Sequence, residues 1–136
     1  MKRIILLTLL CTTTILMAQR INHIQEAIAD YDYETALILI AKEKPTIPLL
    51  LQKGKAQRGL GLNTEALSTY QEIIANDTAN TRAYIEAAEC CRSLAKNQQA
   101  LKYYEQALDL NPENKYVRIQ YIGLLLSLQK FQEALG

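Results

Sequence analysis

A 34-residue period runs through most of the sequence and constrains its fold more than any other feature. The dipeptides Ala66-Leu67, Ala100-Leu101 and Ala134-Leu135 follow one another at this interval. A fixed period of about 20 to 50 residues is the signature of a repeat array, in which each unit is one supersecondary structure stacked on the next. Other residues that keep the interval are Leu60, Leu94 and Leu128, Asn63 and Asn97, Tyr70 and Tyr104, and Asn80 and Asn114.

Within each period the apolar residues recur at helical spacing. Leu94, Leu101 and Tyr104 lie seven and three residues apart, and no comparable stretch alternates as a strand would. Asn63 and Asn97 stand where a helix N-cap is expected. The repeating unit is therefore predicted to be two antiparallel helices.

The unit from Thr81 to Asn114 shows the residue pattern most clearly, with small residues where two helices must approach closely and tyrosines that fill the remaining volume. It carries Tyr84, Ala87, Ala88, Cys91, Ala100, Tyr104, Ala107 and Pro112. A 34-residue period with this pattern resembles the tetratricopeptide repeat family. The resemblance implies an all-α fold, a right-handed superhelical solenoid of antiparallel helix pairs with about three and a half repeats.

The units before and after this one are less regular. The preceding unit has Thr78 where the family usually has Pro. Ala36 lies closer to Ala66 than a full period would place it, so the first hairpin has either short helices or a tight turn. The expected organisation is a signal peptide at 1–18 and a repeat domain at 19–136, made of an irregular hairpin (20–46), two repeats (47–80 and 81–114) and an incomplete repeat (115–136).

The incomplete repeat is expected to stop at Gly136, one or two turns into its second helix. Each unit of an array leaves an apolar face for the next one, so Tyr121, Leu124, Leu125 and Leu128 are expected to be partly uncovered. We expect this chain to be the front part of a longer protein. The alternatives are that a partner covers the edge, or that the chain self-associates through the open C-terminal edge.

The segment 1–18 has the pattern of an export signal rather than of the array. Lys2 and Arg3 precede Ile4–Met17, which is apolar apart from its threonines. This is the charged start and short apolar core of a secretory signal peptide, with cleavage expected after Ala18. A spanning helix needs about 20 apolar residues, and this run is shorter. We therefore expect a periplasmic or secreted protein, with an uncleaved leader anchored to the inner membrane as the alternative.

Charge and residue types exclude several functions. Without Lys2 and Arg3, 13 basic residues face 14 acidic ones, and a chain with this charge of −1 lacks the positive groove that nucleic-acid binding requires. No membrane span is expected after signal cleavage.

No catalytic site, metal site or cofactor is predicted. His23 is the only histidine and is expected to be solvated, and the adjacent Cys90-Cys91 lacks the spacer of zinc and redox motifs and is expected to be two buried thiols. Gly59-Leu60-Gly61 is interpreted as a turn between helices rather than a phosphate loop. Glu86 and Glu89 lie three apart on one helical face, and without a nucleophile they form a solvated or groove-lining pair.

One loop carries two short modification motifs. Asn76-Asp77-Thr78 is an Asn-x-Thr sequon, and Asp77-Thr78-Ala79 resembles the acceptor of some bacterial periplasmic O-glycosylation systems. Glycosylation at Asn76 or at Thr78 stays open at this point.

The resemblance implies a ligand site on the concave face of the array, which the first helix of each unit lines. A basic tilt of this face favours an acidic or carboxylate-ended segment, and a solvated face without a specific ligand is the alternative. The Lys and Asn residues with which some family members clamp a terminal carboxylate are not matched. The candidate partner-binding residues are Leu51, Lys55 and Arg58 in the second unit, Arg82, Ile85, Glu89 and Arg92 in the third, and Ile119 with Gly123 in the fourth.

The sequence therefore predicts an exported protein-interaction scaffold that binds a peptide or partner protein and has no catalysis of its own. The alternative is the N-terminal docking or regulatory module of a longer, membrane-linked sensor or enzyme.

Overall fold

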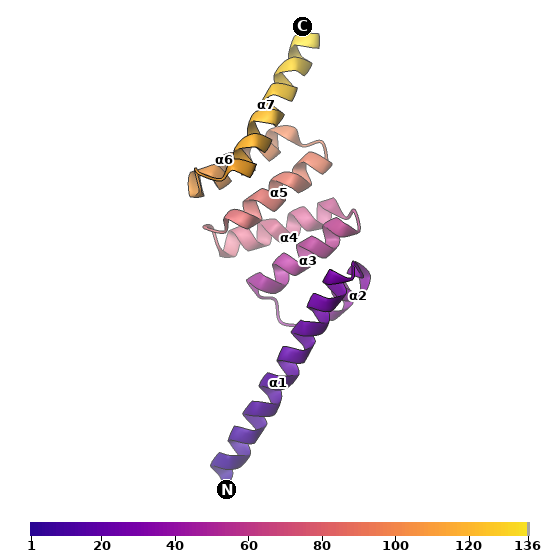
Figure 1. Cartoon of the computed structure of the whole chain (residues 1–136), viewed down its shortest axis with the longest axis vertical. Helices are drawn as coiled ribbons and strands as arrows, with labels where there is room; N and C mark the ends of the chain where they lie inside the picture. Colours follow the sequence, from indigo (N-terminus) through magenta and orange to yellow (C-terminus); the bar gives the residue numbers. More distant parts are fainter. Residues whose placement is uncertain (136) are drawn as a thin grey trace. The chain divides into compact units, whose positions relative to one another are not determined.

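Helices make up all the regular structure in the computed structural model of the chain (Figure 1), which describes residues 1–135 and all of their side chains except that of Ala134. These residues form seven α-helices and no strand, which confirms the predicted all-α fold. The chain divides into two compact units, Met1–Pro45 and the part from Thr46 onward.

The second unit contains five helices that stack in chain order (Figure 1). From α4 onward each helix packs on the one before it, so α4, α5 and α6 bury residues against two neighbours. This is the arrangement expected of stacked helical hairpins. The helices are α3 (Ile47–Gly59), α4 (Asn63–Asn76), α5 (Thr81–Ser93), α6 (Asn97–Leu110) and α7 (Lys115–Leu135).

The core of this unit alternates very small and very large side chains. Tyr70 and Tyr104 occupy equivalent places in α4 and α6 and are among the largest fully buried side chains. Alanines let the helices approach closely around them, which leaves few voids. The alanines with no exposed surface in these helices include Ala66, Ala83, Ala87, Ala88, Ala100 and Ala107.

The turn inside each helix pair has the same backbone geometry three times. The residue after the C-cap is left-handed, with φ of 61° at Tyr31, 76° at Gly61 and 58° at Ala95. In each turn the residue after the left-handed one donates its N–H to the carbonyl oxygen of the residue five positions earlier. The N–H of Leu62, for example, donates to the carbonyl of Gln57 at 2.8 Å. This hydrogen bond is typical of the Schellman motif. Gly59 to Gly61 therefore forms a turn between helices, as predicted from the sequence.

This tight turn also corrects the expected N-caps. Asn63 and Asn97 are the first residues of α4 and α6, and the caps are Leu62 and Lys96, which offer no side-chain hydrogen bond. The reason is that the residue closing the Schellman motif is also the one that opens the next helix. Between pairs the turns are longer, and Asn80 does cap α5 by accepting from the N–H of Ala83 at 3.1 Å.

We expect Ala95→Gly to stabilise the protein, because only glycine adopts a positive φ without steric cost. The gain should be about 0.5–1 kcal/mol in the free energy of unfolding, and Gly61→Ala should lose a similar amount. Urea denaturation of the two variants measures both. An Ala95→Gly protein less stable than the parent would contradict the left-handed turn.

The first unit pairs a long helix with a short one. In α1 (Lys2–Ala29) the buried residues are Ile24, Ala27 and Ile28, and they pack on α2 (Tyr33–Ile40). Helix α2 has 8 residues where α4 and α6 have 14. The short spacing before Ala66 thus comes from a shortened second helix, while the turn at Tyr31 is of the common type.

Helix α1 runs without a break through the expected cleavage point. Every residue before Ile24 is exposed, including the whole apolar run. By length and composition this is the one described helix able to cross a membrane, a test that signal sequences near an N-terminus also pass. The apolar run alone is shorter than a bilayer, but the helix that contains it is not.

Helix α7 differs from the expectation for the incomplete repeat. It continues as one helix to Leu135, with no turn into a second helix. Gln129 stands where Gly61 and Ala95 turn the chain, and the residues around it are mostly strong helix formers such as Leu, Gln, Lys and Glu, which favour a continuous helix. Leu124 is buried rather than uncovered, while Ile122, Leu125 and Leu126 are exposed. The side chain of Ala134 and Gly136, with which the expected repeat ends, lie outside the described part.

Candidate functional site

The first helices α3, α5 and α7 carry an aliphatic row at one repeated position. Leu51, Ile85 and Ile119 are each separated by one 34-residue period. Leu51 and Ile85 are half-buried against the core, and Ile119 is 68% exposed. These three residues, called the aliphatic row below, form the apolar part of the candidate face.

Two of the predicted basic residues are engaged by the following unit. Arg58 of α3 forms an ion pair with Glu86 of α5, and both side chains are partly exposed. One period later, Arg92 of α5 donates to the amide oxygen of Gln120 in α7 at 2.6 Å. Both contacts join an arginine of one first helix to the first helix of the next unit. The acceptor is the carboxylate of Glu86 in one case and the amide of Gln120 in the other.

Glu89 is the centre of a hydrogen-bonded cluster rather than a free acid. Its Oε1 accepts from the hydroxyl of Tyr104 at 2.5 Å and from that of Tyr116 at 3.0 Å, and its Oε2 lies 3.7 Å from Arg92. Burial, followed by the bond to Glu89, raises the pKa of both tyrosines. The cluster joins α5 to α6 and α7.

These contacts change the charge that the face presents. Of the predicted cations, Arg58 and Arg92 are bound within the array, and the carboxylates Glu86 and Glu89 are bound to them. Lys55 and Arg82 are exposed, and neither has an ion pair within residues 1–135. The positive charge that the candidate face leaves available to a ligand is therefore concentrated at these two residues.

The bridges between the first helices were not predicted from the sequence. Arg58 and Glu86 are 28 residues apart, and so are Arg92 and Gln120. In both cases a side chain that can accept a hydrogen bond follows the arginine by 28 residues. This recurrence is the sequence signal that would have revealed the bridges. Glu86 and Gln120 were therefore missed as structural partners of the face.

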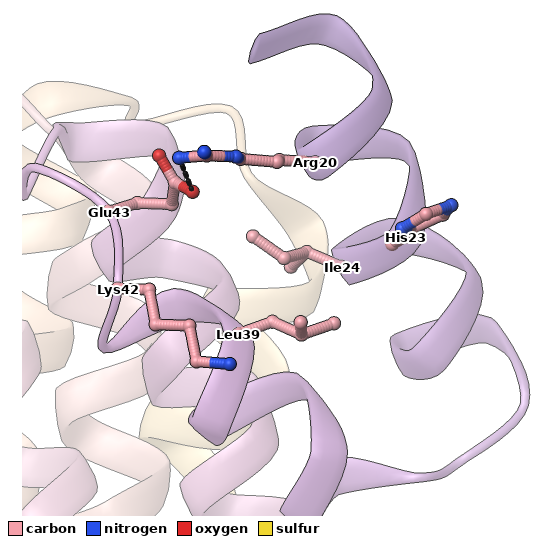
Figure 2. Close-up of a pocket in the computed structure, with 6 residues that line it drawn as sticks. All are labelled: Arg20, His23, Ile24, Leu39, Lys42 and Glu43. Carbon is pink, nitrogen blue, oxygen red and sulfur yellow. Dashed lines mark hydrogen bonds and ion pairs between the residues drawn. The ribbon is translucent and has the colours of Figure 1, made fainter. Parts of the chain in front are cut away.

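An open pocket of about 350 Å³ lies within the first unit (Figure 2). Ile24 of α1 and Leu39 of α2 form its apolar floor, and Arg20 reaches across to Glu43 at 3.3 Å. His23 and Lys42 complete the rim, and both are exposed. The pocket exists where α2 ends early, and its six lining residues include no paired nucleophile and base.

Cys90 and Cys91 are free and buried, as predicted. Burial raises the pKa of the Cys90 thiol to about 11 and also raises that of Cys91. The folded state therefore favours the neutral thiol. The resulting contribution to the stability of the fold is present below pH about 9 and is lost as the pH rises through about 11. An intermolecular disulfide would need Cys90 exposed, whereas it has no exposed surface.

We expect one thiol of the native full chain, Cys11, to react with Ellman's reagent, because only Cys11 is exposed. All three should react in denaturant. Titration at neutral pH with and without guanidinium counts them. Rapid reaction of a second thiol in the native chain would contradict the burial of α5.

Chemistry-bearing groups do not converge elsewhere in residues 1–135. No group of three or more His, Cys, Asp or Glu residues in this part is placed to hold a metal ion. His23 is exposed, as predicted.

Comparison with known sequences decides the family. Two sequence models of the tetratricopeptide repeat match the chain, one over residues 51–114 and the other over residues 93–136. Together they span more than half of it. The chain belongs to the tetratricopeptide repeat family. No curated protein sequence gives a significant match.

Solved tetratricopeptide repeat structures show the same fold. The first such domain of Spaghetti (RPAP3), bound to the HSP90 peptide SRMEEVD, is 21% identical with a TM-score of 0.75, over 79% of this chain and 89% of that one. PcrH in complex with the chaperone-binding region of PopB is 18% identical with a TM-score of 0.68, over 79% and 92%. The second domain of human RPAP3, with the HSP70 peptide SGPTIEEVD, is 17% identical with a TM-score of 0.71, over 77% and 91%.

Proposed function

We propose that this tetratricopeptide repeat protein is an exported interaction scaffold that binds a peptide or a partner segment on the face formed by α3, α5 and α7, without catalysis of its own. The observation that carries the proposal is the aliphatic row with Lys55 and Arg82, which are the two of the four predicted cations that are exposed and have no ion pair within residues 1–135. Three structural neighbours are complexes with peptides or a protein region, which supports the same kind of ligand here.

The ligand that fits this face is an apolar segment with acidic residues. Apolar side chains bury surface against the aliphatic row, and carboxylates meet Lys55 and Arg82, so charge complementarity sets orientation and the rate of association. Glu89 is not available to a basic ligand, because two tyrosines and Arg92 already bind its carboxylate. Arg92 and Arg58 contribute as the rigid framework of the face.

Export is part of the proposal and is supported by the exposure of the N-terminal run. The first buried residue is Ile24, so cleavage after Ala18 removes no core contact. In water the exposed apolar side chains of residues 4–17 are unfavourable, and removal or insertion into a membrane relieves this. Mass spectrometry of the chain from a bacterial periplasm should find Gln19 as the first residue.

A second candidate is a docking module that α1 anchors in the membrane. The length and hydropathy of α1 favour it, since the 28-residue helix passes the test for a membrane span. Recovery of the intact chain in washed membranes, with Met1 retained, supports this candidate and overturns cleavage.

Pull-down from extracts of the source cells tests the binding face. The double variant Lys55→Glu with Arg82→Glu should lose the partners retained by the native chain, because both changes reverse the charge that the ligand meets. The matched control, Lys44→Glu with Lys102→Glu, reverses two exposed charges outside α3, α5 and α7 and should retain them. If the native chain, the double variant and the control capture the same partners, the site is refuted.

A further inference from the structure

The turn between α4 and α5 carries a feature that partner binding does not use. It holds both modification motifs, the Asn76-Asp77-Thr78 sequon and the Asp77-Thr78-Ala79 triplet. The side chains of the two possible acceptors, Asn76 and Thr78, have different surroundings in the structure. This difference distinguishes glycosylation at Asn76 from glycosylation at Thr78.

Asn76 is bound to its own helix. It is the last residue of α4, and its side-chain nitrogen donates to the carbonyl oxygen of Glu72 at 2.8 Å. An N-linked sugar would have to replace a hydrogen on that same nitrogen, next to a helical backbone. The sequon is therefore poorly presented as an N-glycosylation acceptor.

Thr78 is free by comparison. It is exposed in the turn, and its hydroxyl takes part in no hydrogen bond within residues 1–135. The neighbouring Asp77 fixes the turn instead, since its carboxylate accepts from the N–H of Ala79 at 3.2 Å and from the amide of Asn80 at 2.9 Å. Thr78 thus sits on a rigid, exposed turn with its reactive oxygen pointing to no partner.

The next turn shows that the fold does not need this hydroxyl. Asn80 donates its N–H to the carbonyl of Asp77 at 3.2 Å, and one period later Asn114 donates to Asn111 at the same distance. In the second turn Pro112 stands in the position of Thr78. A residue without a hydroxyl forms the same turn, so the hydroxyl of Thr78 is dispensable for structure.

We propose that Thr78 is the acceptor of an O-linked sugar on the exported chain. The inference rests on the proposed export, because the transfer it requires takes place outside the cytoplasm. The co-reactant is a sugar activated as a lipid diphosphate. A bond forms between the threonine Oγ and the anomeric carbon, the bond from that carbon to the diphosphate oxygen breaks, and the lipid diphosphate leaves with the electron pair. A base on the transferase takes the hydroxyl proton.

The site also favours a sugar over a phosphate. A phosphate would place about two negative charges beside the carboxylate of Asp77, which repels them. A neutral sugar does not meet this repulsion. Its bulk extends into solvent from an exposed turn.

The full chain expressed in a bacterium with periplasmic O-glycosylation of Asp-Thr-Ala sites tests the proposal. Trypsin releases the turn on one peptide, from Gly59 to Arg82, whose other hydroxyl residues serve as internal controls. Electron-transfer fragmentation of this peptide from the periplasmic fraction should place a sugar mass on Thr78. Thr78→Pro copies the Pro112 turn and should fold with an unchanged thermal midpoint while losing the sugar, and Asn76→Gln should keep it.

Each other outcome is decisive. An unmodified peptide in the periplasmic fraction, a phosphate mass, or a sugar on Asn76 overturns the acceptor role and leaves the scaffold untouched. A chain found only in the cytoplasm overturns export and this inference together, while the binding face on α3, α5 and α7 stands. A Thr78→Pro protein that keeps the sugar mass places it elsewhere and also overturns the proposal.

Discussion

Gly54→Ala should destabilise the protein by about 2 kcal/mol, although alanine is the better helix former. Gly54 lies inside α3, and a Cβ there would stand 2.5 Å from Cζ of Tyr70 and 2.8 Å from its hydroxyl oxygen. Tyr70 is 1% exposed and surrounded by packed residues, so its ring has no free volume to enter. Overpacking of this kind outweighs the gain in helix propensity of about 1 kcal/mol.

The chain offers a matched control in α7. A Cβ at Gly123 meets nothing within 4 Å, so Gly123→Ala should gain about 1 kcal/mol from helix propensity alone. Thermal unfolding by circular dichroism compares the two variants. The double variant Gly54→Ala with Tyr70→Leu should recover part of the loss, because the smaller side chain makes room. A Gly54→Ala protein as stable as Gly123→Ala would show that the tyrosine does not contact α3.

Glu89→Ala should lower the free energy of unfolding by about 2 kcal/mol, since it leaves the hydroxyl of the fully buried Tyr104 without its acceptor. The comparison is Glu86→Ala, which breaks a partly exposed ion pair with Arg58 and should cost less than about 1 kcal/mol. In a Tyr104→Phe background, Glu89→Ala should cost about 1 kcal/mol less, because no hydroxyl is then stranded. Equal costs in both backgrounds would contradict the cluster.

The same cluster gives the protein a pH dependence at alkaline pH. Burial and the bond to Glu89 raise the pKa of Tyr104 and Tyr116, so the folded state favours the neutral phenols. Their contribution to stability is present below the unfolded pKa of about 10 and is lost as the pH rises through the higher folded values. Phenolate absorbance should therefore appear at higher pH in the native chain than in Glu89→Ala.

The 34-residue period was enough to predict the helix pairs and their small and large core residues. Ala88, Ala100 and Ala107 are fully buried and Tyr104 fills the space between them, because the period fixes which residues meet. Local chemistry decided the exceptions. The Schellman turn moved Asn63 inside its helix, and the strong helix formers around Gln129 left α7 unbroken.

The charge of the face could be predicted only in part. Residue type and register placed Arg58 and Arg92 on the first helices, but which side chain each one reaches depends on the spacing between stacked helices. That spacing is a property of the packed array, so the 34-residue period alone did not identify Glu86 and Gln120 as the partners of these arginines. As a result Lys55 and Arg82 became the basic residues of greatest interest.

Mapping a bound peptide on the array tests the central claim most directly. Peptides are selected from a random library on the full chain, and the tightest is titrated into methyl-labelled protein. We predict saturable shifts at Leu51, Ile85 and Ile119, acidic residues in the peptide, and at least a tenfold weaker affinity for Arg82→Glu, which corresponds to about 1.4 kcal/mol. Shifts confined to α4 and α6, with an affinity that Arg82→Glu leaves unchanged, would contradict the account.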